Sequence, residues 1–201
     1  MSHGFKILLL SIAVQLFVAG NRVYADGVAS EATKISAHFG SAVVESSGFY
    51  KGRIPISTIL GVDVQVGVLE QLGLIISSEV GGAVYFNLSG GFRYFPWSNS
   101  GKFRLASPYI VSSHDYPIKP FFSAALNRGQ LRLQTQDDIG ATQITSQFLG
   151  GAFGGGVAGN LADRWEAVLT VEYARLMASA ESAVAFTGNR FSLTGGFSYA
   201  L

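Results

Sequence analysis

The pair His114-Asp115 is the place in this sequence where residue types invite catalysis. An imidazole beside a carboxylate, in a chain rich in serine, suggests a hydrolase. A catalytic triad depends on geometry, however, and neighbouring residues of a strand point to opposite faces, so the pair could share a site only within a loop. We therefore expect His114 to be a solvated loop histidine, and His38 to occupy a polar interior or rim position.

No other motif in the sequence supplies chemistry. Metal-ligand spacings are absent, and the glycine-rich run 150–156 lacks the strand, turn and helix context of a dinucleotide site. We expect no catalytic residue, no cofactor and no bound metal.

Five charged residues share a feature with possible functional meaning, because each falls on the polar phase of a strand-like run. They are Asp63, Arg93, Glu166, Glu172 and Arg190. Charges enclosed by a sheet must be paired or hydrated, since desolvating an isolated ion is expensive. They could line a solute path or form an ion-pair network that plugs the interior. We favour the network, because side chains can fill the interior of an eight-stranded barrel.

The two closing runs of the chain, 165–176 and 190–201, alternate apolar and polar residues with a period of two. This pattern also fits a soluble antiparallel sheet with one wet face. Trp165 and Tyr173 bracket the apolar stripe of the first run, and Phe197 and Tyr199 share the apolar phase of the second. Aromatic residues in such positions are typical of the girdles of transmembrane β-strands, so we predict that these four face lipid.

Similar alternation recurs in residues 34–44, 62–68, 72–76, 84–94, 121–133 and 147–161. Together with the closing runs this predicts an all-β fold, an antiparallel up-and-down transmembrane barrel of about eight strands. The turn-rich residues 45–55 and the polar residues 134–140 are expected to be loops. Residues 97–120, with a possible short strand at 102–111, are too long for a turn. They form either an excursion at the periplasmic end or a miscounted pair of strands.

Composition and the N-terminus indicate an exported protein. Residues 1–25 read as a signal peptide, in which Lys6 precedes an apolar run and Ala25 ends the cleavage site, leaving residues 26–201 as the barrel domain. The apolar run is too short for a spanning helix. A net charge of +1 without a basic cluster argues against nucleic-acid binding. Because cysteine is absent, stability must come from sheet closure and burial, and lipid attachment at a cysteine is excluded.

Three stretches carry a resemblance to a known family. They are residues 148–201, with the turn Asn160-Leu161-Ala162-Asp163-Arg164, and the shorter segments 119–125 and 90–95. These resemble the small outer-membrane β-barrel proteins of Gram-negative bacteria, of the OmpA-like or opacity-protein type within the porin family. The resemblance implies that the last strand is recognised by the outer-membrane assembly machinery. The family's last strand usually ends in phenylalanine, whereas this one ends in Leu201.

From the resemblance we expect an integral protein of the bacterial outer membrane with a structural or surface-interaction role. Its expected partners are outer-membrane lipid, the assembly machinery and an unidentified surface ligand, and no enzymatic activity is expected. Three alternatives remain open at this point. They are an outer-membrane enzyme that modifies lipid or peptide, a small-solute channel, and a soluble periplasmic barrel with its apolar face turned inward.

Overall fold

The computed structural model describes residues 33–48, 52–69, 71–82, 85–96, 102–107, 110–115, 118–137, 140–162, 164–179 and 186–201. The expected signal peptide lies outside these residues. The described part of the chain forms ten strands: β1 (Lys34–Gly48), β2 (Gly52–Leu69), β3 (Leu72–Gly81), β4 (Tyr85–Tyr94), β5 (Lys102–Ser107), β6 (Ile110–Asp115), β7 (Ile118–Asp137), β8 (Gly140–Ala162), β9 (Trp165–Ala178) and β10 (Phe186–Ala200).

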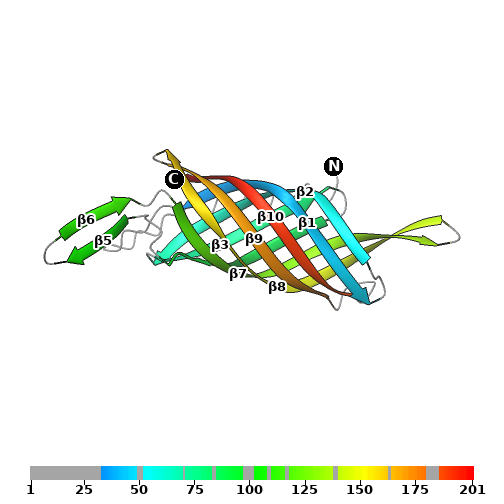
Figure 1. Ribbon diagram of the computed structural model, residues 1–201. Coiled ribbons are helices and arrows are strands. Elements are labelled where there is room, and N and C mark those ends of the chain that lie inside the picture. Colours follow the sequence, from blue (N-terminus) through cyan, green and yellow to red (C-terminus); the bar gives the residue numbers. More distant parts are fainter. Residues whose placement is uncertain are drawn as a thin grey trace.

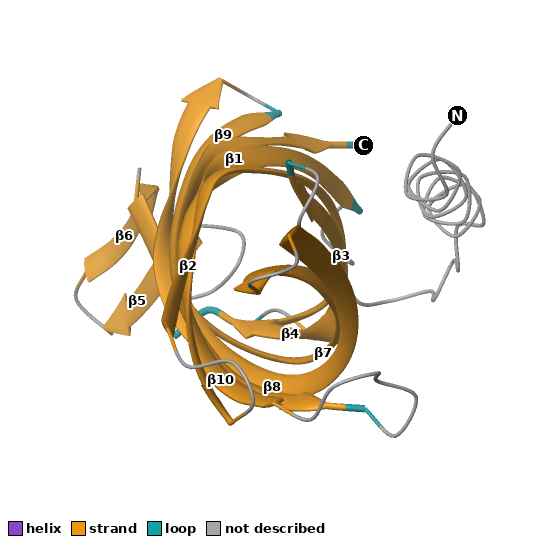
Figure 2. Ribbon diagram, turned by 90° about the vertical axis from the view of Figure 1, so that its right-hand side faces the viewer, coloured by secondary structure: helices purple, strands orange, loops and turns teal. Residues whose placement is uncertain are grey.

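Eight of these strands close into an antiparallel barrel in the order β1-β10-β9-β8-β7-β4-β3-β2. Closure is achieved by β1, which pairs with β2 on one side and with β10 on the other. The view along the barrel shows the closed ring (Figure 2). The predicted all-β, eight-stranded, up-and-down barrel is confirmed. A closed sheet has no free edge, so each barrel strand has a backbone partner on both sides.

The two ends of the barrel differ. Lys34 at the start of β1 pairs with Ala200 at the end of β10. The first strand therefore starts, and the last strand finishes, at the same end of the barrel, which we call the terminus end. At the opposite end, the loop end, β7 and β8 continue as a two-stranded ribbon. Their ladder runs on to Asp137 and Gly140, past Leu131, the last partner of β4. The ribbon projects from the barrel in Figure 1.

The connection from β4 to β7 contains a separate hairpin. β5 and β6 pair only with each other, from Lys102↔Asp115 to Ser107↔Ile110, and project at the terminus end (Figure 1). Of the two alternatives for residues 97–120, the excursion is therefore right, and the barrel keeps eight strands. The expectation that His114 is a loop histidine is wrong, because it belongs to β6, as does Asp115.

The two expected loops, 45–55 and 134–140, are also largely strand. β1 continues to Gly48 and β2 begins at Gly52, while only residues 138 and 139 separate β7 from β8. Residues that favour turns are extended here, because hydrogen bonding to the partner strand stabilises the extended conformation. Pro55 is accommodated opposite Val43, next to a register shift between β1 and β2 where β2 has an extra residue between Ile56 and Ile59. Proline cannot donate to a ladder, so it is tolerated near such an irregularity.

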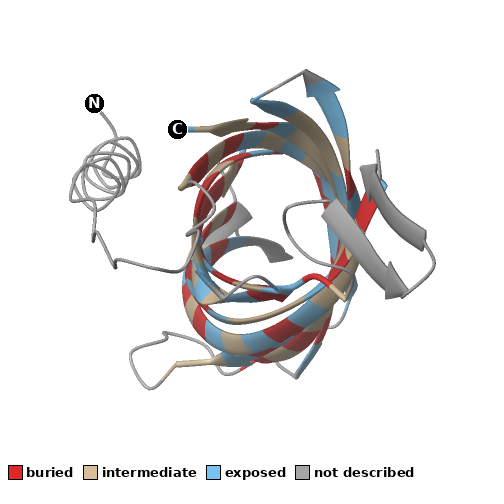
Figure 3. Ribbon diagram, turned by 90° about the vertical axis from the view of Figure 1, so that its left-hand side faces the viewer, coloured by how far each residue is buried: buried red, intermediate tan, exposed pale blue. Residues whose placement is uncertain are grey.

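Inward and outward residues alternate along every barrel strand (Figure 3). The outward face is apolar and exposed, and includes Phe39, Leu74, Phe92, Phe122, Leu126, Phe153, Leu169 and Leu193. The inward face carries buried polar and charged residues, which include Ser36, Asp63, Gln65, Glu79, Asn87, Arg93, Asn127 and Arg190. The barrel thus has an apolar exterior and encloses its buried polar and charged groups, the reverse of a soluble domain.

Candidate functional site in the barrel lumen

The structure places all five charged residues singled out in the sequence inside the barrel. Asp63, Arg93 and Arg190 are buried, and Glu166 and Glu172 lie on the inward phase of β9. They do not all contact one another. Arg190 and Glu172 form an ion pair within a first group of residues, whereas Glu166 lies nearer the terminus end and contacts other cations. The lumen also contains charged partners that the sequence had not indicated.

Arg190 on β10 is the centre of the first group. Its side chain is 1% exposed and forms ion pairs with Glu172 and, at 2.9 Å, with Glu79 of β3. It also donates a hydrogen bond to the Tyr85 hydroxyl of β4. Tyr85 and Asn87 donate to the same carboxylate oxygen of Glu79, each at 3.1 Å. The guanidinium therefore joins strands from opposite sides of the barrel, and its buried charge is compensated by two carboxylates.

Glu79 also connects this group to His38 of β1. The imidazole lies between two carboxylates, with Nδ1 3.3 Å from Asp63 and Nε2 3.5 Å from Glu79. Neither nitrogen makes a well-aligned hydrogen bond. The interior position expected for His38 is the one that the structure shows.

Two glycines allow close packing around His38. Gly61 is its cross-strand partner on β2, and a Cβ built there would approach Nε2 to 2.2 Å. Gly196 is its partner on β10, and a Cβ there would lie 2.2 Å from the carbonyl oxygen of Ala37. The backbone of both neighbours therefore approaches His38 more closely than any other residue would allow.

Arg93 occupies a different environment, nearer the terminus end. It donates to Gln65 Oε1 at 3.1 Å, and its guanidinium lies 4.2 Å from the centre of the Phe121 ring. The contact with the aromatic face stabilises the Arg93 cation, which forms no direct ion pair with the side chains that the structure describes. Phe95 packs against Phe121 as well, with the two ring centres 5.7 Å apart.

Glu166 is held by two lysines at the terminus end. Lys34 of β1 lies 3.1 Å from it, and Lys119 of β7 donates a short hydrogen bond to the same carboxylate oxygen. The described lumen thus carries four permanent cations (Lys34, Arg93, Lys119 and Arg190) and four carboxylates (Asp63, Glu79, Glu166 and Glu172). This balance leaves no net charge inside the barrel apart from any proton on His38.

The loop-end half of the lumen is apolar. Side chains from all eight barrel strands except β3 form a buried cluster there, composed of Ala42, Val44, Ile56, Ile59, Tyr85, Leu131, Phe148, Ala152, Ala174, Leu176 and Phe186. We call this cluster the apolar plug. Tyr85 stacks on Phe148 within it, with ring centres 6.2 Å apart. The interior is therefore filled by apolar side chains in one half and by polar and charged side chains in the other, whereas the sequence had suggested polar and charged side chains alone.

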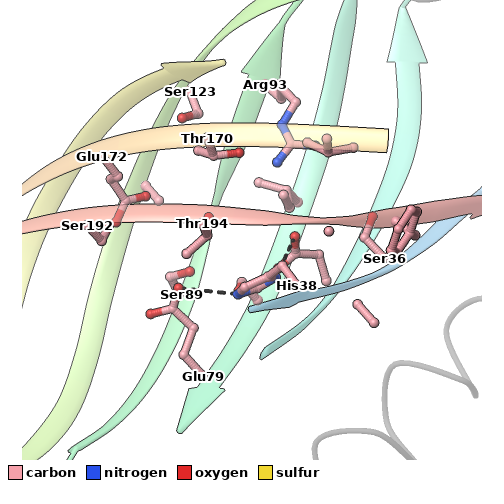
Figure 4. Close-up of a pocket in the computed structure, with 18 residues that line it drawn as sticks. Ser36, His38, Glu79, Ser89, Arg93, Ser123, Thr170, Glu172, Ser192 and Thr194 are labelled. Atoms are coloured by element: carbon pink, nitrogen blue, oxygen red, sulfur yellow. Dashed lines mark ion pairs between the residues drawn. The ribbon is translucent and has the colours of Figure 1, made fainter. Parts of the chain in front are cut away.

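A cavity of about 60 Å³ remains between the charged groups. Besides ionic groups it is lined by hydroxyls, namely Ser36, Ser77, Ser89, Ser123, Thr170, Ser192 and Thr194. Figure 4 shows the labelled lining side chains on several strands around the cavity, with His38 and Glu79 on one side. The volume is sufficient for a few water molecules, and Arg93, which lines the cavity, has a buried Nε without a protein partner.

The structure offers no support for a metal centre or a helical anchor within its described ranges. No group of three or more histidine, cysteine, aspartate or glutamate side chains there is arranged to hold a metal ion. None of the described elements is a helix long and apolar enough to cross a membrane.

The four aromatic residues expected to face lipid are placed on the outward face. Trp165 packs against Tyr199 at the terminus end of β9 and β10, with ring centres 5.0 Å apart. Tyr173 lies further along β9, where its ring centre is 5.1 Å from that of Phe153 and 5.0 Å from that of Phe191. Phe197 is exposed on the same face.

Comparison with known proteins extends the description at the level of fold. No protein-family model and no curated protein sequence matches the chain. Among solved structures it is similar to neisserial surface protein A, with a TM-score of 0.54 and 13% identity over 86% of this chain and 99% of that one. It is also similar to the N-terminal β-barrel domain of Pseudomonas aeruginosa OprF, with a TM-score of 0.50 and 12% identity over 85% and 99%. The chain therefore has the fold of the small outer-membrane β-barrels.

Proposed function

We propose that this chain is an integral protein of the bacterial outer membrane, with a closed lumen and a structural or surface-interaction role. The observation that carries the proposal is the outward face of the closed barrel. Large apolar side chains are exposed on it around the whole ring, far beyond the patch of a few hundred Å² that soluble monomers tolerate. A bilayer is the solvent in which such a face is stable, because closure satisfies every backbone group of the spanning strands.

Signal-directed export and a defined orientation belong to the same proposal. Residues 1–25 direct export, and the last strand, β10, is the segment that the assembly machinery recognises. The terminus end then remains in the periplasm, while the loop end, with the β7–β8 ribbon, faces the outside. The ribbon is the part of the described chain best placed to meet a surface ligand, because its strands extend beyond their barrel neighbours.

Gel mobility and detergent dependence test the membrane assignment. The folded barrel should migrate faster than the boiled sample in a gel containing dodecyl sulfate, and should give a β-type circular dichroism spectrum in detergent. A mature chain, lacking residues 1–25, that stayed soluble and monomeric without detergent would disprove the proposal.

A small-solute channel is the second candidate, and the polar cavity is the observation that favours it. The apolar plug lies between this cavity and the loop end, so we expect no stable conductance from the wild-type protein in planar bilayers. Regular single-channel steps would establish the channel instead. No catalytic activity is part of the proposal. Lipid analysis of cells with and without the protein, and with His114→Ala, would reveal an enzyme acting on lipid.

A further inference from the structure

The outward-facing charges of the barrel strands gather at the loop end. Among the barrel-strand side chains that the structure describes, the outward arginines are Arg53, Arg128, Arg132 and Arg175, and the outward carboxylate is Glu45, which pairs with Arg53 at 2.9 Å. At the terminus end, none of the described outward-facing strand side chains is charged. The described strand residues therefore carry outward positive charge at one rim and no outward charge at the other, a distribution that packing of the barrel does not require.

Arg175 on β9 is fixed at the border between the apolar exterior and this rim. Its Nη1 donates to Asn189 Oδ1 at 2.8 Å, and the Tyr173 hydroxyl donates to the same oxygen at 3.0 Å. Below this polar contact, the Tyr173 ring packs between Phe153 and Phe191. A guanidinium has five donors in a rigid fork, so a single amide oxygen leaves it able to bind an anion as well.

The register of the sheet places a second arginine across β8 from Arg175. Gly151 is the partner of Arg175, and Leu149, two positions along the same outward face, is the partner of Arg128 on β7. A Cβ built at Gly151 would meet nothing within 4 Å. The two arginines therefore flank an open stretch of β8, and each lies two positions beyond an apolar outward residue of its own strand, Leu126 or Tyr173.

We propose that Arg128 and Arg175 bind the phosphate of an anionic membrane lipid over Gly151 of β8. The inference rests on the proposed membrane function, because the ligand must present a phosphate and an apolar chain together. The guanidinium groups match the phosphate, since arginine forms paired, charge-assisted hydrogen bonds with it. The aromatic surface of Phe153, Tyr173 and Phe191 lies directly below, where the acyl chains of that lipid would run. A free phosphate ion would gain nothing from this surface.

Lipid binding to the folded protein in detergent micelles tests the proposal. Native mass spectrometry would count bound phosphatidylglycerol, with phosphatidylcholine of the same chains as the neutral comparison and inorganic phosphate as a competitor. The test variant is Arg128→Gln with Arg175→Gln. The matched control is Arg53→Gln with Arg132→Gln, which removes two outward arginines from the same rim. The single variants replace either pair if a double variant does not fold.

We expect the test variant to raise the Kd for phosphatidylglycerol about tenfold, as loss of charge-assisted hydrogen bonds implies. The control should change it less than about threefold, since exposed charges act weakly at a distance. Equal effects in both variants, equal affinity for phosphatidylcholine, or displacement by millimolar inorganic phosphate would overturn the inference. These results concern a barrel already folded in detergent. A chain that needs no detergent would instead contradict the proposed function itself.

Discussion

Replacement of Arg190 by methionine tests whether the lumen network holds the barrel together. The side chain is 1% exposed and compensates Glu79 and Glu172, so Arg190→Met keeps much of the volume but leaves two interior carboxylates without their main partner. Removing one member of a buried ion pair costs about 3–5 kcal/mol. We therefore expect the free energy of unfolding to fall by about that amount.

Arg53→Met is the matched control for this change. Arg53 pairs with Glu45 at the same distance of 2.9 Å, but its side chain is 78% exposed. Exposed ion pairs contribute at most about 1 kcal/mol, because water and salt screen them. The two variants therefore compare the same ionic contact inside and outside the barrel.

Urea-induced unfolding from phospholipid vesicles, followed by circular dichroism, would give both values. The denaturant dependence of the free energy should be the same for wild type and variants if the same surface is exposed on unfolding. Adding Glu79→Gln to Arg190→Met should recover part of the loss, since one uncompensated carboxylate is then removed. A loss below about 1 kcal/mol for Arg190→Met, or one equal to that of Arg53→Met, would refute the argument.

Three further changes test other parts of the structure by the same unfolding measurement. Gly61→Ala should lower the free energy of unfolding by about 1–3 kcal/mol, because the added Cβ would lie 2.2 Å from the buried imidazole of His38. Gly90→Ala is the control: a Cβ there meets nothing within 4 Å, so the loss should not exceed about 0.5 kcal/mol. Phe148→Ala should cost about 3–5 kcal/mol by leaving a cavity in the apolar plug, and a smaller loss would mean that the plug is loosely packed. Trp165→Ala and Tyr199→Ala, combined in a double-mutant cycle, should couple by about 0.5–1.5 kcal/mol, while strictly additive losses would contradict the ring contact.

The architecture was predictable from the sequence because a closed barrel with an apolar exterior imposes one rule on every strand. Apolar residues recur at alternate positions, as in the run from Trp165 to Tyr173, so the period of two persists along the chain. Local turn signals were less informative. Residues 45–55 contain glycine, serine and proline, yet most of them are strand, because pairing with neighbouring strands decides the local conformation.

The inward phase was also readable from single strands, but the contacts within the lumen were not. Arg190 meets Glu79 from a strand on the other side of the barrel, and their separation in the sequence is 111 residues. Which inward residues face one another depends on the stagger between strands, a property of the closed sheet as a whole. The same alternation that indicated Asp63 could have indicated Glu79 and Lys119, because both lie on the inward phase. Which residues they contact across the lumen can be found only once the register between the strands is known.

Tyr85 joins the two halves of the lumen. Its ring stacks on Phe148 in the apolar plug, while its hydroxyl accepts a hydrogen bond from Arg190 and donates one to Glu79. The plug keeps water away from the loop-end side of the ion pairs, and ionic attraction is stronger where water is excluded. The ion pairs in turn fix the tyrosine against the plug. In the proposed closed barrel, a solute path would therefore require both the packing and the network to rearrange, since neither can move without displacing Tyr85.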